Sequence, residues 1–176
     1  MAIGEVRPGY ELWHPNREKP GVVTTRLVIA FLMLATAVIA TVVTITGFSL
    51  LSGGQSMGIV CLIYAALYAL FAYRVVRWSR GVLPVAAALS TILAIFCAVG
   101  ANSWFARNKA DFAAATIPAP AIGTLVVILG LIQLVLIAVA FYGFSQAWNV
   151  EEERPIGSGE DYGAGAPPDR TSAQPA

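Results

Sequence analysis

Few side chains in this sequence could carry chemistry, and they lie far apart. The single histidine, His14, is close to the N-terminus, and a long stretch separates the two cysteines, Cys61 and Cys97. Zinc and iron sites need three or four clustered ligands, and haem often needs a pair of histidines. We therefore expect no catalytic residue, no metal site and no cofactor of the chain's own.

Gln133 is the only strongly polar side chain deep inside an apolar stretch. Hydrogen bonds of such residues between helices in lipid contribute about 0.6–2 kcal/mol. We expect the Gln133 side chain to form a structural hydrogen bond within a helix bundle or to a neighbouring subunit. Contact with a polar ligand, such as a quinone or a lipid head group, is the alternative.

Cys61 and Cys97 fall about one turn from the same end of two consecutive apolar segments. If these segments are antiparallel helices, the two sulfur atoms lie at similar depth in a membrane. A disulfide between Cys61 and Cys97 is then geometrically allowed. Two buried free thiols are the default expectation for such cysteines.

The composition indicates a membrane protein. Of the 176 residues, 57% are hydrophobic and 12% are charged, whereas soluble domains average about 45–50% and 25%. Four segments are long enough to cross about 30 Å of hydrocarbon and contain no charged residue. They are 27–51, 57–73, 82–101 and 121–147. We predict an all-α, polytopic integral membrane protein built as a bundle of four transmembrane helices. The composition argues against a cytosolic enzyme with a soluble substrate, and a net charge of +1 without a basic run argues against nucleic acid.

The basic residues predict the orientation of the bundle. Nine of the 11 lysines and arginines lie in the N-terminal tail (1–26), in the loop between the second and third segments, and in the C-terminal tail. Basic loops stay in the cytoplasm. We therefore predict a multi-pass protein of the bacterial plasma membrane with both termini cytoplasmic. Residues 148–176 are rich in Gly, Pro and acids, and we predict that they form a disordered acidic tail.

Two groups of aromatic residues are candidates for contact with other subunits. In the outer loop 102–120, Trp104, Phe105 and Phe112 are spaced to share one side of a short amphipathic helix lying in the membrane interface. In the second segment, Tyr64, Tyr68 and Phe71 form a stripe at helical spacing. Core packing or lipid contact is the simpler interpretation of this stripe, and lateral contact with a partner subunit is the alternative.

Three functions compete on these observations. The first is a non-catalytic accessory subunit that contacts lipid and other integral membrane subunits. The second is a small oligomeric channel or carrier, against which the thin polar lining of the segments counts. The third is a membrane enzyme using loop residues such as Asp111 or Glu151, but the sequence offers no paired acids at a plausible site. We favour the accessory subunit because transport usually needs an ionisable residue within the membrane.

Nine arginines against two lysines, together with 29 alanines, are typical of a high-GC bacterium. The layout of a polar N-terminal tail, four uncharged segments and an acidic Pro/Gly-rich tail resembles the small four-span membrane proteins of actinobacteria. Some proteins of that kind accompany respiratory assemblies such as the cytochrome bcc–oxidase supercomplex. The resemblance implies that haem and copper are held by partner subunits, which this chain would stabilise or position.

Overall fold

The computed structural model describes residues 9–48, 54–107 and 117–156 of the chain. Its elements, in chain order, are β1 (Tyr10–Trp13), α1 (Pro15–Glu18), α2 (Pro20–Gly47), α3 (Gly54–Val76), α4 (Val82–Ala106), α5 (Ala119–Ser145) and β2 (Glu152–Pro155). The chain divides into two compact units, which are described separately. Of the described residues, those within 16–149 form the helical unit, and residues 9–15 and 150–156 form the second unit.

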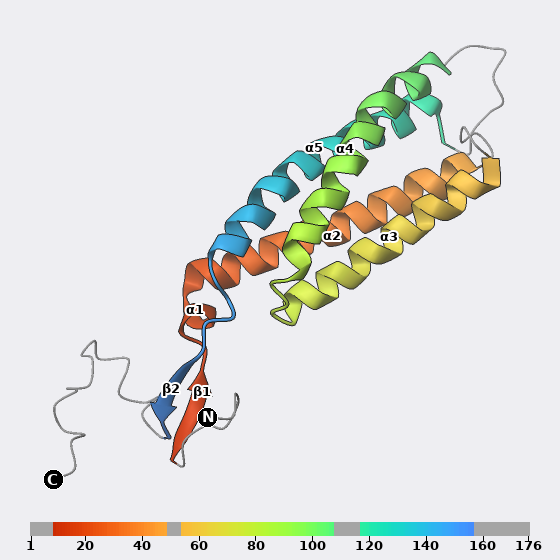
Figure 1. Cartoon of the computed structure of the whole chain (residues 1–176). Helices are drawn as coiled ribbons and strands as arrows, with labels where there is room; N and C mark the ends of the chain where they lie inside the picture. The colour runs from red at the N-terminus through yellow and green to blue at the C-terminus, as the bar shows by residue number, and fades with distance from the viewer. Residues whose placement is uncertain (1–8, 49–53, 108–116, 157–176) are drawn as a thin grey trace, which may run out of the picture. The chain divides into compact units, whose positions relative to one another are not determined.

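The helical unit is the predicted all-α bundle. Helices α2, α3, α4 and α5 are each long and apolar enough to cross a membrane. Helix α2 packs on α3 and α5, and α4 packs mainly on α5, whereas α3 and α4 make few contacts with each other. Figure 1 shows α3 and α4 diverging from the turn that joins them. The chain is therefore a multi-pass membrane protein. Its bundle is loosely packed on the side where α3 and α4 face each other.

The helix bounds differ from those of the predicted segments. Helix α2 begins at Pro20 rather than at residue 27, because proline suits the first turn of a helix, where the missing N–H would have no partner. Helix α4 continues to Ala106 rather than ending at residue 101. Trp104 and Phe105 therefore belong to α4 and not to a separate interfacial helix. Phe112, the third residue of that predicted helix, lies outside the described residues.

An unusual turn joins α3 to α4. Trp78 has φ of 64°, the left-handed conformation that normally favours glycine. The N–H of Trp78 donates to the Val75 carbonyl, and the N–H of Ser79 donates to the Arg74 carbonyl. This pair of bonds is a Schellman motif with tryptophan at the glycine position. A bulky residue there costs about 1–2 kcal/mol, so its side-chain contacts must offset the strain.

Those contacts come from elements distant in the sequence. The Trp78 ring meets the Trp148 ring edge to face, with 5.8 Å between centroids. The guanidinium carbon of Arg26 lies 3.9 Å from the centroid of the Trp78 ring, and that of Arg17 lies 5.6 Å from it. We call this end of the bundle, where α2 begins and α5 ends, the Trp78 end. The opposite end is called the Trp104 end.

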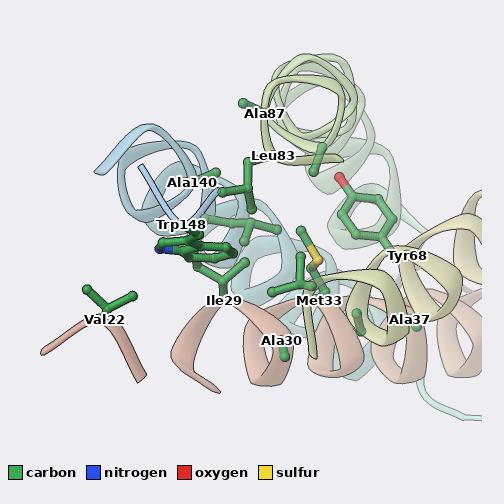
Figure 2. Close-up of a cluster of buried hydrophobic side chains, with 14 residues drawn as sticks. Val22, Ile29, Ala30, Met33, Ala37, Tyr68, Leu83, Ala87, Ala140 and Trp148 are labelled. Carbon is green, nitrogen blue, oxygen red and sulfur yellow. The ribbon is translucent and has the colours of Figure 1, made fainter. Parts of the chain in front are cut away.

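Trp148 is fully buried in the core at the Trp78 end. Figure 2 shows its indole beside Ile29 of α2 and Leu83 of α4. The indole Nε1 donates to Gln146 Oε1, and the Gln146 amide donates to Thr25. Arg17 donates from Nε to the Trp148 carbonyl at 3.0 Å. Residue 148 was predicted to begin a disordered tail, but the chain instead turns back after α5 and closes the core.

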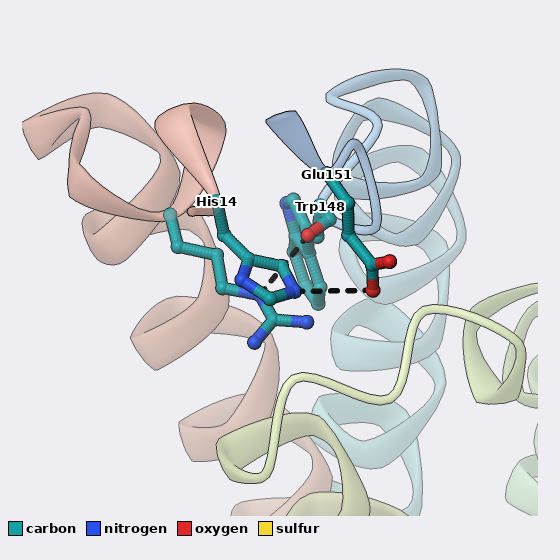
Figure 3. A network of polar contacts seen from close by, with 4 residues as sticks. His14, Trp148 and Glu151 are labelled. Carbon is teal, nitrogen blue, oxygen red and sulfur yellow. Dashed lines mark hydrogen bonds and ion pairs between the residues drawn. The ribbon is translucent and has the colours of Figure 1, made fainter. Parts of the chain in front are cut away.

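The second unit joins the two ends of the chain. Strands β1 and β2 pair antiparallel, with Glu11 opposite Arg154. Arg154 donates to Glu11 at 2.6 Å, and its guanidinium carbon lies 5.3 Å from the centroid of the Trp13 ring. His14 and Glu151 approach to 3.3 Å (Figure 3). The start of the predicted disordered tail is thus a short strand, and residues 157–176 lie outside the described residues.

Replacing Trp148 tests whether this residue belongs to the core. We expect Trp148→Ala to destabilise the bundle by about 3–5 kcal/mol, because it removes a buried indole and leaves a cavity. Thermal unfolding of the protein in mild detergent measures the change. The matched control is Phe141→Ala on α5, whose exposed ring should leave the transition almost unchanged. Equal shifts for the two variants would mean that Trp148 is not a core residue.

Candidate functional site

A buried polar network links all four spanning helices. It contains Thr36 of α2, Tyr68 of α3, Ser90 of α4 and Gln133 of α5, and none of these side chains is exposed. The Tyr68 hydroxyl lies 2.9 Å from both Ser90 Oγ and Gln133 Oε1. The Gln133 amide nitrogen donates to Thr36 Oγ1 at 2.9 Å. Each helix therefore contributes one polar residue to a single connected cluster.

The directions of these hydrogen bonds follow from the chemistry of the groups. The Gln133 amide nitrogen also donates to the Leu129 carbonyl, which can only accept, so the orientation of the amide is determined. Its Oε1 must then accept the one proton of the Tyr68 hydroxyl. Ser90 therefore donates to Tyr68, while Thr36 donates to the Leu32 carbonyl at 2.8 Å. Every donor of the network has an acceptor, as burial in a bundle requires.

The hydrogen bonds of the network indicate which of the roles considered for Gln133 is favoured. With both amide hydrogens and the carbonyl oxygen engaged by protein, Gln133 has no group directed at a ligand. The interpretation of Gln133 as a structural bond within the bundle fits this geometry, and the quinone or head-group alternative does not. Nor can Gln133 or Tyr68 contact a partner subunit, because neither side chain is exposed.

A groove of about 650 Å³ lies between α3 and α4, on the Trp104 side of the network. Helices α2 and α5 supply its floor, including Val43, Thr44 and Leu129. Its rims carry exposed side chains, among them Val60 of α3 and Phe96 of α4. The groove ends at Tyr68, and its other end is at Ser103 and Arg107. It is the space left where α3 and α4 diverge.

The aromatic candidates occupy different environments. Trp104 is buried against Gly47, where an added Cβ would come within 2.5 Å of the ring, so glycine permits this close approach of α2 and α4. Phe105 is exposed and lies over Gly123 of α5. Tyr64 is half-buried in the wall of the groove, with its ring centroid 6.2 Å from that of Tyr68.

Phe71 is partly buried against the core cluster of the Trp78 end. The stripe of Tyr64, Tyr68 and Phe71 therefore serves core packing and the groove, which is the simpler of the two interpretations. Cys61 and Cys97 are free thiols, and both line the groove. The default expectation for the cysteines thus describes their state in this structure, although Cys61 is only half-buried.

Cationic side chains cover the Trp78 end of the bundle. Arg80 donates from Nε to the Phe144 carbonyl at 2.7 Å and from a terminal nitrogen to Asn149 at 2.8 Å. Arg26 donates to the Val76 carbonyl and stacks on Trp78. These arginines bond to the carbonyl oxygens at the C-terminal ends of α3 and α5, where a helix dipole favours positive charge.

The fold and these features define a multi-pass membrane protein with a four-helix bundle, a polar interior contact and a lateral groove. Among the described residues, no three histidine, cysteine or acidic side chains lie close enough to hold a metal ion. Comparison with known proteins adds no family to this class. No family model matches the sequence, and neither the curated proteins nor the solved structures include a significant match.

The network predicts a measurable coupling between Tyr68 and Gln133. We expect Tyr68→Phe and Gln133→Leu each to destabilise the bundle, and the double variant to lose about 0.6–1.7 kcal/mol less than the sum of the two. Unfolding in mild detergent gives the three free energies. Tyr142→Phe, at an exposed tyrosine of α5, is the control and should show no coupling to Gln133→Leu. Strict additivity for Tyr68 and Gln133 would contradict the hydrogen bond between them.

Proposed function

We propose that this protein is a non-catalytic accessory subunit of a larger membrane protein complex. The single observation that carries the proposal is that the deep polar side chains of all four helices are bonded to one another. Groups that perform transport or catalysis within a membrane must be available to a solute or substrate. In this bundle the corresponding groups hold the helices together.

The second unit supplies a surface through which such a subunit could contact its neighbours outside the membrane. Leu12 of β1 and Ile156 after β2 are exposed apolar side chains, and the strands also carry the exposed acids Glu152 and Glu153. Exposed apolar groups rimmed by charged residues are typical of protein contacts. The partners that we propose are integral membrane subunits. Following the resemblance of the sequence, we propose a bacterial respiratory assembly in which those partners hold haem and copper.

We also propose that the Trp78 end faces the cytoplasm of a bacterium. Arg17, Arg26, Arg74, Arg77 and Arg80 gather at this end, whereas Arg107 is the only described arginine at the Trp104 end. The positive-inside rule favours this orientation, which places both termini in the cytoplasm of a plasma-membrane protein.

Purification in mild detergent tests the accessory role. We expect the chain to co-purify at equal stoichiometry with a larger complex. We further expect deletion of the chain to reduce the amount of assembled complex more than its turnover per assembled copy. Quantitative mass spectrometry and activity per haem measure the two effects. A homo-oligomer of this chain that conducts ions or carries a solute in liposomes would favour the channel alternative and overturn the accessory role.

Single cysteines test the orientation. In a Cys61→Ala/Cys97→Ala background, Ser79→Cys reports on the Trp78 end and Asn102→Cys reports on the Trp104 end. With a membrane-impermeant maleimide, we expect Asn102→Cys to react in intact cells and Ser79→Cys to react only after lysis. The cysteine-free background is the control for non-specific labelling. The reverse pattern would place the termini outside.

A further inference from the structure

The groove between α3 and α4 has the size and the openness of a ligand site that is entered from the membrane. Its volume of about 650 Å³ falls in the range of about 300–1,000 Å³ that is usual for small-molecule pockets. Exposed side chains form its rims on the side of the bundle, among them Val60 and Val99. A molecule already dissolved in the bilayer could therefore enter it sideways, without passing through water.

The depth of the groove matches one leaflet of a bilayer. Along α3 its lining runs from Ser56 to Tyr68, and along α4 from Leu93 to Arg107. At 1.5 Å per residue, these stretches span about 18 and 21 Å. Half of a bilayer's hydrocarbon core is about 15 Å thick, with the head groups beyond it. The groove thus reaches from the head-group level at the Trp104 end to the middle of the membrane.

The lining is polar at the Trp104 end and apolar further in, just as a phospholipid has a polar head group and apolar acyl chains. At the Trp104 end, the lining includes the cation of Arg107 and the hydroxyl groups of Ser56 and Ser103. Among the described residues of the lining, Arg107 is the only charged one, and its guanidinium carbon lies 4.9 Å from the centroid of the Trp104 ring. Further in, the wall is mostly aliphatic and aromatic, with the thiols of Cys61 and Cys97. The Thr44 hydroxyl there donates to the Ala40 carbonyl, and the Tyr68 hydroxyl is engaged in the polar network.

We propose that this groove binds an anionic phospholipid of the leaflet at the Trp104 end. One acyl chain lies between α3 and α4 against Val43 and Leu129, and the phosphate lies beside Arg107. Charge complementarity identifies the head group, because arginine and phosphate form strong, charge-assisted hydrogen bonds. The inference does not depend on the accessory role, since a lipid site of this kind serves a lone bundle equally well.

A transmembrane helix of a partner is the competing occupant, and the length of the groove argues against it. A helix needs about 20 residues to cross the bilayer and would pack along the full length of α3 and α4. Towards the Trp78 end, however, the space is filled by core residues, including Leu83, Ala86 and Tyr68. A groove that is blocked at the bilayer centre and runs along only half of each helix fits an acyl chain, because an acyl chain ends at the bilayer centre.

Lipid binding to the full-length protein in detergent tests the proposal by native mass spectrometry. Phosphatidylglycerol and phosphatidylcholine with identical acyl chains are the probes. We expect one tightly bound phosphatidylglycerol and weaker binding of phosphatidylcholine. Arg107→Gln should weaken the binding of phosphatidylglycerol by about fivefold and leave the binding of phosphatidylcholine unchanged. Arg77→Gln, at the opposite end of the bundle, is the matched control and should alter neither lipid.

A second pair of variants tests the acyl-chain position. Gly100→Leu adds a side chain to the lining at a glycine whose Cβ would meet no atom within 4 Å, so the bundle can accept it. We expect it to weaken both lipids by more than about tenfold, because it displaces at least two buried methylene groups. Ala98→Leu, an exposed position of α4 outside the lining, is the control and should bind both lipids normally.

The free thiols of Cys61 and Cys97 provide an independent readout. Phosphatidylglycerol should slow their alkylation by a small apolar maleimide in the wild type and not in Gly100→Leu. Unchanged lipid binding in Gly100→Leu would overturn the site, and unchanged phosphatidylglycerol preference in Arg107→Gln would overturn the head-group assignment. Cross-linking from Cys61 to a second polypeptide, without bound lipid, would assign the groove to a helix instead.

Discussion

Hydrocarbon offers no hydrogen-bonding partner, so each polar group in the bundle must find one within the protein. The structure meets this constraint in two ways. Hydroxyl groups such as those of Thr44 and Thr91 donate to carbonyls of their own helix, and every spanning helix contributes one residue to a shared cluster of Thr36, Tyr68, Ser90 and Gln133. Because the contribution of each helix is bonded to another helix, rotation of any one helix about its axis would break at least one bond. The cluster therefore selects one arrangement of four apolar helices that could otherwise pack in several ways.

The two ends of the bundle are closed by different means. At the Trp78 end, arginines bond to carbonyl oxygens at helix ends, and Trp148 fills the core beneath them. At the Trp104 end, glycines at positions such as 47 and 123 let α2 and α5 approach the aromatic residues of α4, but α3 remains apart from α4. This asymmetry follows from the short turn between α3 and α4, which brings these helices together at one end only.

The sequence was sufficient to predict the four helices and the need of Gln133 for a hydrogen-bonding partner, because both depend on local properties. An uncharged stretch of the right length spans a membrane whatever its neighbours are, and an isolated amide in such a stretch needs a partner. The burial of Trp148 was not predictable in this way, since it depends on Ile29 and Leu83 from other helices. Nor was the inward direction of Trp104, because α4 extends past the predicted segment 82–101 and places this residue against Gly47.

The tryptophan in the left-handed turn after α3 has a consequence for the order in which the protein is built. Its conformation is stabilised by Arg26, which precedes it in the chain, and by Trp148, which is synthesised only after all four helices. A ribosome-bound chain that ends before Trp148 thus carries the strain of this turn without its aromatic support. The aromatic contact that stabilises the turn between α3 and α4 therefore forms only after the last helix, α5, has been synthesised. We therefore expect the α3–α4 turn to reach its final conformation only once Trp148 has joined the core.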